Sequence, residues 1–528
     1  MRSPLEIRYR FGPLERRGWI GALRPGQVAI LTTAVFFTIL LVQALKNGLG
    51  LLGGVLLLST GALLTFVPLH GRPLNEWVPV IGVFMARKAT GRSRFRSRAP
   101  EAGTRFAGGD EPVSLPDSIG KVELLAFPFR GVELGVLADR PNHTFSAVIQ
   151  ARARSFVLLD PVDKAHRLAG WAGVIAGLAR EGSPISRVQW IERTAPDDPD
   201  ALSRYLREAI DPSIGLDALP LQSYLRLTHA AAPVTEQHEL FIVLQVNAGK
   251  AGRAIKQAGG KDTGACMVLA RELETMARRL ESAEVEVLHA LGPRRLAATI
   301  RLSYDPHARA NLARLDSVDP DRQGGVSARN AWPMRAEEHW GYYRTNDVVH
   351  ATYWIAEWPR IDVGPDFLAP LLVQTRSMRT VAVTMEPVPP LKAMRAVGFA
   401  KTADVADEEL RQKLGFLGTA KRRNQADAVN RREQELADGH ADVRFSGYIT
   451  VTADNPEALA EACGEVEHAA GLTGFEVMGQ FALGLVAKHM TQLRVPLYEQ
   501  APYCVLLENS DQESEPHARA GFQVRRHQ

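Results

Sequence analysis

The chain has 528 residues, of which 45% are hydrophobic and 23% are charged. This is the composition of a core-forming protein of three or four domains, and it excludes collagen-like, mucin-like and disulfide-rich miniprotein classes. The three cysteines, Cys266, Cys463 and Cys504, have the spacing of neither a zinc site nor a disulfide framework. We therefore expect the folded part to lie in a reducing compartment.

The positive charge is confined to the N-terminal part. Residues 1–106 contain fifteen Lys and Arg and four Asp and Glu, a net charge of +11, while the whole chain carries +4. Residues 107–528 therefore carry −7. An acidic body opposes binding to nucleic-acid phosphates, because that affinity depends mainly on basic residues that displace counterions. The charge distribution thus disfavours direct DNA binding by most of the chain.

Two uncharged apolar segments follow each other near the N-terminus. They are Val28–Leu45 and Leu49–Leu69, separated by three residues. Each is close to the length that a helix needs to cross the hydrocarbon core of a bilayer. A buried hairpin of a soluble protein is disfavoured because two such runs lack any charge, and a cleaved signal peptide is disfavoured because a good cleavage site is missing. We predict a two-helix transmembrane hairpin within 27–69.

Basic residues flank this hairpin on both sides. Six precede the first segment and seven follow the second, whereas only Lys46 lies between them. The positive-inside rule then predicts a multi-pass protein of the cytoplasmic (inner) membrane whose termini and large body are cytoplasmic. Small residues in the second segment, such as Gly54 and Gly61, permit close packing against the first segment or against a partner's helices.

The hairpin is expected between two juxtamembrane segments. Residues 1–26 form a basic cytoplasmic segment, and residues 70–114 form an interfacial stub, a basic elbow and a linker. The apolar stretch Glu76–Lys88 with its basic end is either an interfacial helix or a stub that leads off the membrane. The arginine run 92–98 could bind DNA, but attraction to anionic lipid headgroups is the favoured interpretation. The residues predicted at the membrane interface are Trp19, Arg24, Trp77, Arg87, Lys88, Arg92, Arg94, Arg96 and Arg98.

Patterns of strands and helices alternate in the body. We predict a first α/β domain over 115–330, a second over 331–510 and a disordered tail over 511–528. Two segments look like versions of one β-α-β unit, with strands at 239–246 and 285–290 around one helix and at 443–452 and 475–478 around the other. Either an internal duplication or the independent use of a common β-α-β motif accounts for this similarity. The predicted fold class is α+β, a transmembrane helical hairpin followed by repeated ferredoxin-like, split β-α-β units.

Two further segments of the body have alternative interpretations. Residues 404–437 are predicted as one long polar helix, with a solvated helix favoured over a nucleic-acid-binding rod because acids and bases alternate. The aromatic segment 332–358 could stack single-stranded nucleic acid, but the acidic body favours a core or a protein interface. The candidate partner-interface residues are Trp340, Trp354 and Trp358.

No catalytic or cofactor motif is found in the sequence. The phosphate-binding string Gly-x4-Gly-Lys-Ser/Thr, a nucleophile elbow, a His-Glu-x-x-His helix and a dinucleotide fingerprint are all missing. The fourteen histidines have no spacing that requires a metal. We therefore predict a protein that is not an enzyme and that has no catalytic residue, cofactor or metal.

Five stretches of the chain resemble an actinobacterial family of conjugation proteins. They are RYRFGPLERRG at 8–18, Ala22–Gly26, the exit from the second apolar segment at 71–77, IRLSYDP at 300–306 and EQELADGHADVRFSGY at 433–448. The resemblance covers nearly the whole chain, with a departure after Gln480. It implies a PrgI-type, two-span membrane subunit of type IV secretion, fused to a domain similar to the N-terminal, non-motor half of the conjugation ATPase. The motor would then be a separate polypeptide.

The residues and the resemblance lead to one functional expectation. The protein is expected to be an inner-membrane scaffolding subunit of a conjugative, type IV secretion-like apparatus that anchors a separately encoded motor ATPase to the channel. Its expected partners are anionic lipids, that ATPase and further copies of the chain. The alternative is a membrane-tethered nucleic-acid-binding module, or an enzyme whose site is unrecognised.

Overall fold

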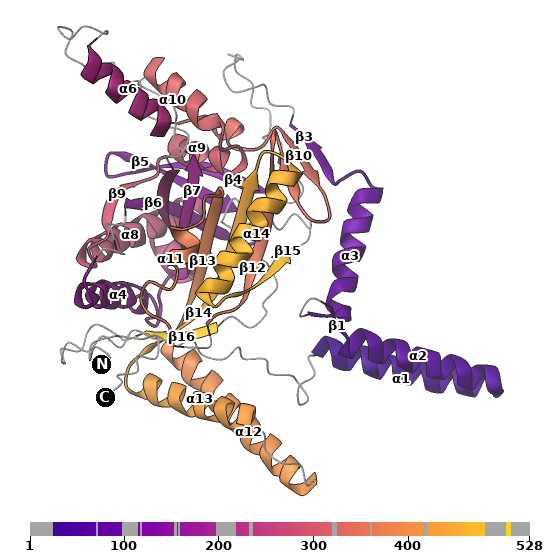
Figure 1. Ribbon diagram of the computed structural model, residues 1–528. Helices are drawn as coiled ribbons and strands as arrows, with labels where there is room; N and C mark the ends of the chain where they lie inside the picture. Colours follow the sequence, from indigo (N-terminus) through magenta and orange to yellow (C-terminus); the bar gives the residue numbers. More distant parts are fainter. Residues whose placement is uncertain are drawn as a thin grey trace, which may run out of the picture.

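The computed structural model describes residues 25–69, 72–97, 115–116, 119–152, 156, 159–196, 218–231, 236–318, 325–359, 362–414, 420–480 and 503–507. It consists of an apolar helical rod, a large antiparallel sheet with helices on both faces and a projecting helical hairpin (Figure 1). The expected class, two apolar N-terminal helices before an α+β body, is confirmed. The ferredoxin-like assignment and the domain boundaries stay predictions. The expectations for 1–24, most of the linker and the tail lie outside the described residues.

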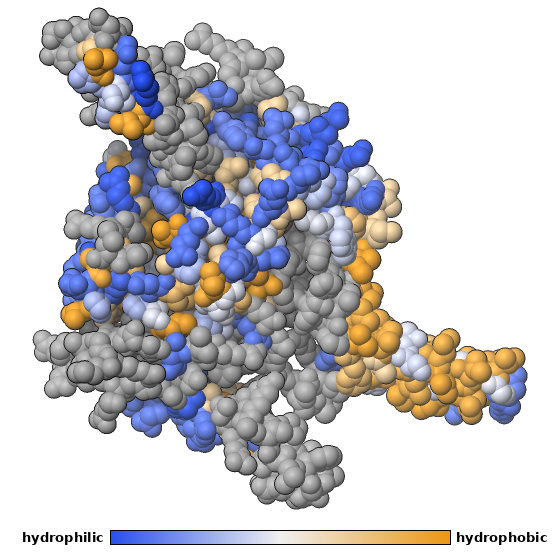
Figure 2. Space-filling view, viewed as in Figure 1, coloured by the Kyte–Doolittle hydropathy of each residue, from blue (hydrophilic) through white to orange (hydrophobic). Residues whose placement is uncertain are grey.

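The rod is formed by α1 (Pro25–Leu45) and α2 (Gly48–Phe66), which pack side by side. Asn47 caps α2 by accepting a hydrogen bond from the amide of Gly50 at 3.0 Å. The small residues of α2 face α1: a Cβ added at Gly61 would lie 2.8 Å from Cβ of Ala34. These glycines therefore allow α2 to pack closely against α1. The outer surface of the rod is apolar and exposed (Figure 2).

A third helix, α3 (Leu74–Ala89), follows a minimal hairpin of β1 (Pro68–Leu69) and β2 (Arg72–Pro73). The Leu74 amide donates a hydrogen bond to the Val67 carbonyl at 3.2 Å, so the chain turns sharply between α2 and α3. As a result, α3 runs across the direction of the rod (Figure 1).

The main sheet has the strand order β3-β10-β11-β12-β14-β13-β7-β8-β6-β5-β4, and the pairings along it are antiparallel. Three further strands pair beside this path: β9 with β6, β15 with β12 and β16 with β14. The strands are β3 Arg94–Arg96, β4 Val122–Phe129, β5 Val132–Asp139, β6 Thr144–Arg152, β7 Ile185–Pro196, β8 Glu236–Asn247, β9 Glu286–Ala290, β10 Arg335–Glu338, β11 Tyr343–Thr345, β12 Val348–Glu357, β13 Arg379–Val388, β14 Ala441–Ala453, β15 Glu476–Gln480 and β16 Tyr503–Leu507.

The sheet consists of two halves in which strands and helices are connected in the same order. In the first half, β6 lies between β8 and β9, the two strands that α8 (Lys261–Ser282) connects. In the second half, β12 lies between β14 and β15, which α14 (Pro456–Thr473) connects. The two segments that the sequence paired as versions of one unit thus hold equivalent places. The halves meet where β7 pairs with β13, from Arg379 opposite Thr194 to Met385 opposite Val188.

The two faces of the sheet carry separate apolar cores. On one face α4 (Pro161–Ala176), α8 and α14 cover a core that runs through both halves and includes Leu244, Leu269 and Val451. On the other face α9 (Pro293–Tyr304) packs against β4 and β5 and buries Tyr304 completely. Four shorter helices are also described in the body: α7 (Gly252–Gln257), α10 (Ala308–Val318), α11 (Ala369–Leu372) and the 3-10 helix η3 (Ala328–Ala331).

Each half has a helical insertion between its two central connected strands. In the first half α6 (Leu219–Ala231) lies between β7 and β8, and in the second half α12 (Pro390–Leu414) and α13 (Ala420–Ala437) lie between β13 and β14. The prediction of one helix over 404–437 is therefore wrong. Two poor helix formers in the connection, Gly415 and Gly418, disfavour a continuous helix. An ion pair between Lys401 and Glu433 joins α12 to α13 at 2.6 Å.

Candidate functional site

The candidate site is the junction between the apolar rod and the sheet, formed by α3, β3, β10 and β11. β3 pairs with β10 so that Phe95 lies opposite Ala336, and Phe95 packs against the core beneath α9. Two flanking hydrogen bonds extend this ladder, from the Ser97 amide to the Met334 carbonyl and from the Glu338 amide to the Ser93 carbonyl. The segment that leaves the rod is thus itself an edge strand of the sheet.

Side chains of α3 add two contacts to this ladder. The Phe84 side chain is 7% exposed and meets the Trp340 ring edge to face, with 5.2 Å between the ring centroids. One turn later, Nη2 of Arg87 lies 2.6 Å from Oε1 of Glu338, whose side chain is 4% exposed. A charge pair that is this sheltered from water costs much more to break than a surface pair. The rod, α3 and the sheet are therefore held together as one unit.

The predicted membrane-interface residues fall into three groups. Trp19, Arg24 and Arg98 lie outside the described residues. Trp77, Arg87 and Lys88 belong to α3, and Arg92 lies in the turn that follows it. Arg94 and Arg96 lie in β3 with exposed side chains, Arg94 only 3.9 Å from Glu337. The structure brings the described members of the set to one junction, and their contact with lipid stays a prediction.

The three tryptophans proposed for a partner interface occupy different environments. Trp340 lies between β10 and β11, is 38% exposed and contacts Phe84. Trp354 is half-buried in β12. Trp358 is buried, with its ring 4.7 Å from that of Phe445 and 4.9 Å from that of Phe475. Trp358 is a core residue, and Trp340 is the most exposed of the three.

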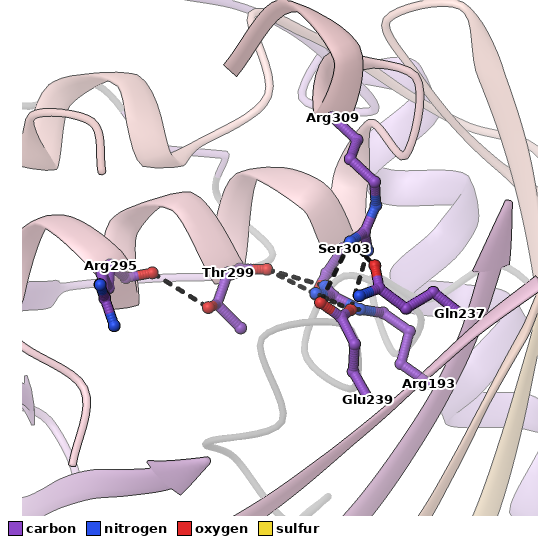
Figure 3. Close-up of polar contacts among 7 residues, drawn as sticks. All are labelled: Arg193, Gln237, Glu239, Arg295, Thr299, Ser303 and Arg309. Carbon is purple, nitrogen blue, oxygen red and sulfur yellow. Dashed lines mark hydrogen bonds and ion pairs between the residues drawn. The ribbon is translucent and has the colours of Figure 1, made fainter. Parts of the chain in front are cut away.

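A second polar centre lies in the body, where α9 and α10 meet β7 and β8 (Figure 3). Arg193 of β7 and Arg309 of α10 both contact Glu239 of β8, with Nη2 atoms 2.6 Å and 2.9 Å from its Oε2. Nη1 of Arg193 also donates to the Thr299 carbonyl and the Ser303 hydroxyl of α9, each at 3.0 Å. One carboxylate and two guanidiniums thus connect two strands to two helices.

The electrostatics of this centre favour a structural role. Burial of the Glu239 carboxylate opposes its charge, but the guanidiniums of Arg193 and Arg309 outweigh burial and lower its pKa to about 2. Burial lowers the pKa of Arg193, and Glu239 opposes that shift. A carboxylate that stays ionised and is already engaged by two arginines is a poor general acid or base.

His350 is buried between two threonines on the same face of the sheet. Its Nε2 lies 2.7 Å from Oγ1 of Thr345 and its Nδ1 lies 2.9 Å from Oγ1 of Thr452. Burial lowers the pKa of His350 to about 3, although a backbone hydrogen bond with Tyr304 partly opposes the shift. The imidazole is therefore neutral at physiological pH and acts as a hydrogen-bonding group within the sheet.

Among the described residues, no cluster of three or more His, Cys, Asp and Glu side chains could hold a metal ion. Burial raises the pKa of the Cys266 thiol to about 11, so this cysteine is a poor nucleophile. The predictions of no enzyme activity and no metal stay predictions.

Sequence reasoning missed the residues that fasten the junction and the polar centre. Phe84 and Glu338 were not singled out, and neither were Arg193, Glu239 and Arg309. Their contacts join residues that are far apart in the chain, and no local periodicity encodes such a partner.

Comparison with known proteins adds one match. Residues 234–355 match the family model described as "Putative type VII ESX secretion system translocon, EccE". No curated protein matches the chain. The matched residues run from β8 to β12 and include Glu239, Trp340 and His350. With the two helices that are apolar and long enough to cross a membrane, the match indicates a membrane-associated protein with a domain similar to a structural, translocon-type subunit of a secretion system.

Proposed function

We propose that the protein is a membrane-anchored scaffolding subunit of a secretion translocon, and that its body positions a separately encoded motor ATPase beside the channel. One observation carries this proposal: the segment that leaves the apolar rod enters the sheet of a body that, over 234–355, resembles a translocon component. A rigid connection of this kind suits a subunit that must hold other proteins at a fixed place relative to the membrane.

Between secretion types, the family match favours type VII. It lies in the body and includes β10, the strand that receives β3. The type IV conjugative apparatus is the second candidate, and the motifs at 8–18 and 433–448 favour it. The partners that purify with the protein distinguish the two apparatuses.

The experiment is purification of the tagged full-length protein from native membranes in mild detergent, followed by mass spectrometry. We expect a motor ATPase and further membrane subunits of one secretion apparatus in stoichiometric amounts. A matched pair of variants tests the junction. Arg87→Ala breaks the sheltered ion pair with Glu338 and is expected to lower partner recovery, whereas Arg130→Ala removes an exposed pair with Glu274 and is expected to leave recovery unchanged. Recovery of the protein alone, from membranes in which the apparatus is assembled, would contradict the proposal.

The proposal includes the absence of an intrinsic nucleotide site. Without a P-loop lysine and its backbone cradle, the main attractive interactions for phosphate are missing. Calorimetric titration of MgATP into the purified full-length protein is therefore expected to give no heat of binding. Micromolar affinity, or hydrolysis without a partner, would favour the alternative of an enzyme with an unrecognised site.

A further inference from the structure

The two sides of α3 differ sharply in character. Phe84 and Arg87 point toward the sheet, where they contact Trp340 and Glu338. The opposite side is formed by exposed, uncharged residues at the spacing of one helical face, namely Val78, Gly82, Met85 and Ala89. Val78 is 55% exposed and Met85 is 59% exposed. Figure 2 shows apolar surface running from the rod onto this helix without interruption.

The orientation of α3 relative to the rod and the sheet determines where its uncharged side points. The rod formed by α1 and α2 points away from the sheet, and α3 runs across the rod at its base (Figure 1). Helices that cross a bilayer stand close to its normal, with an average tilt of about 20°. A helix that lies across them, at the end nearer the body, then lies near the plane of the headgroups. Since the sheet occupies one side of α3, the uncharged side faces the leaflet that the rod enters.

We infer that α3 lies in the headgroup region of the bilayer, with Val78, Gly82, Met85 and Ala89 in contact with the acyl chains of one leaflet. The occupant of this exposed apolar face is thus a lipid surface. The face continues the lipid-facing surface of the rod, and no charged residue interrupts it. Lys88 is exposed in the last turn, where its ammonium can reach headgroup phosphates. The inference rests on the proposal that α1 and α2 cross the membrane.

Depth measurements distinguish an in-plane helix from a stalk that leaves the membrane. From Val78 to Ala89 the helix rises by about 16 Å, at roughly 1.5 Å per residue. If α3 were a stalk, a probe at position 89 would therefore lie well outside the acyl region that a probe at position 78 touches. If α3 lies in the plane, probes at 78, 85 and 89 have the same depth.

The experiment places single cysteines in the full-length protein in a background with Cys266→Ala, Cys463→Ala and Cys504→Ala, whose melting temperature is first checked against the natural chain. Val78→Cys, Met85→Cys and Ala89→Cys are labelled with bimane and reconstituted into vesicles of phosphatidylcholine and phosphatidylglycerol. A nitroxide near the carboxyl end of the acyl chains serves as quencher. We expect equal, strong quenching at all three positions. Val83→Cys is the matched control, because Val83 is exposed but lies about 200° around the helix from Met85. It should be quenched several-fold less.

The other outcomes overturn the inference. Quenching that falls steadily from position 78 to position 89 would show a stalk, and equal quenching at positions 83 and 85 would show no preferred face. Absence of quenching at positions 78, 85 and 89, with strong quenching of a probe at Val55 in α2 by a deep nitroxide, would mean that protein covers the face while the rod still spans the bilayer. If the Val55 probe is also unquenched, the spanning role of the rod fails, and the inference fails with it. Repeating the series in pure phosphatidylcholine isolates the contribution of anionic headgroups.

Discussion

The Phe84 ring stands edge to face against the Trp340 ring, although one residue belongs to the helix that leaves the apolar rod and the other to the sheet. Next to this contact, the Arg87 guanidinium reaches the sheltered Glu338 carboxylate, and β3 pairs with β10. Three kinds of interaction thus act at one place. The position of the body relative to the apolar rod is therefore set by packing, by charge and by backbone hydrogen bonds together.

Trp340→Ala and Trp358→Ala are expected to behave differently. The first removes an aromatic contact worth about 0.5–1.5 kcal/mol, so we expect faster amide exchange in α3 and little change in the melting temperature. The second opens a cavity beside Phe445 and Phe475, and a loss of about 3–5 kcal/mol should lower the melting temperature strongly. Hydrogen exchange by mass spectrometry and calorimetry on the detergent-solubilised protein provide the two measurements. Equal destabilisation by both variants would contradict the assignment of Trp340 to the junction.

Glu239→Gln is expected to destabilise the body by about 3–5 kcal/mol, because it leaves the buried Arg193 and the partly sheltered Arg309 without a counterion. The same loss in the natural protein should occur with acid. Since the folded pKa of Glu239 is lowered from 4.5 to about 2, its stabilising contribution is complete above about pH 4.5 and is lost between about pH 4.5 and 2. Chemical unfolding over this interval should show a shallower pH dependence in the variant.

An exposed ion pair is the control for this measurement. Glu274→Gln removes the partner of Arg130, and the two side chains are 33% and 70% exposed. We expect a change of less than about 1 kcal/mol. A loss as large as that of Glu239→Gln would indicate a general effect of charge.

The buried His350 leads us to expect a second pH dependence of folding stability, at milder pH than that of Glu239. Its folded pKa is lowered from 6.5 to about 3, so the unfolded chain binds a proton below about pH 6.5 that the folded protein excludes. Folding stability from this group is complete above about pH 6.5 and falls with acid until about pH 3. Between about pH 7.5 and 5.5 we expect the natural protein to lose about 1.4 kcal/mol more than His350→Gln. Denaturant titrations at the two pH values test this. Equal losses of folding stability in the natural protein and in His350→Gln would contradict a neutral, buried His350.

Gly61→Leu is expected to prevent the close packing of α1 and α2. Even a Cβ at position 61 would lie 2.8 Å from Cβ of Ala34, so a branched side chain must push the helices apart. Gly48→Ala is the control, because a Cβ at Gly48 has no neighbour within 4 Å. We expect a lower yield of folded protein from membranes and a lower melting temperature for the first variant only. Equal behaviour would mean that the rod tolerates a wider separation.

The orientation of the rod is open to direct labelling. Thirteen basic residues flank the two apolar helices and one lies between them, so the tip at Asn47 is expected outside the cytoplasm and Ser114 inside. Cysteines introduced at these two positions should react oppositely with an impermeant reagent in intact cells. Equal reactivity would contradict the predicted topology.

Local patterns in the sequence located many of the elements but few of the contacts between them. The predicted strand 239–246 is β8, which extends from Glu236 to Asn247, because a continuous apolar run with β-branched residues is visible without tertiary information. The residues that join α9 and α10 to the sheet were not predicted. A buried Arg193 looks like an exposed one until the partner on a neighbouring strand is known.

The aromatic segment illustrates the same limit at the end of one strand, since Trp354 lies in β12 and Trp358 directly follows its last residue, Glu357. Trp354 and Trp358 are four residues apart, and a regular strand would place both on one face. The register of β12 with β15 shifts between Ile355 and Glu357, and a β-bulge of this kind changes the face of every residue after it. Trp358 therefore enters the core shared with Phe445, while Trp354 stays on the other face. A bulge depends on the partner strand, so alternation in the sequence could not reveal it.

The antiparallel pairing of β7 with β13 has a mechanical consequence for the whole subunit. The chain leaves β7 after Pro196, at the end where β13 begins with Arg379, so α6 and the α12–α13 hairpin project from opposite ends of the sheet (Figure 1). A pull between these two arms runs along the strands. The hydrogen bonds of the central ladder then bear the load in shear, all at once, rather than opening one after another as in a zipper. We therefore expect the body to resist extension most strongly along the line that joins its two projecting arms.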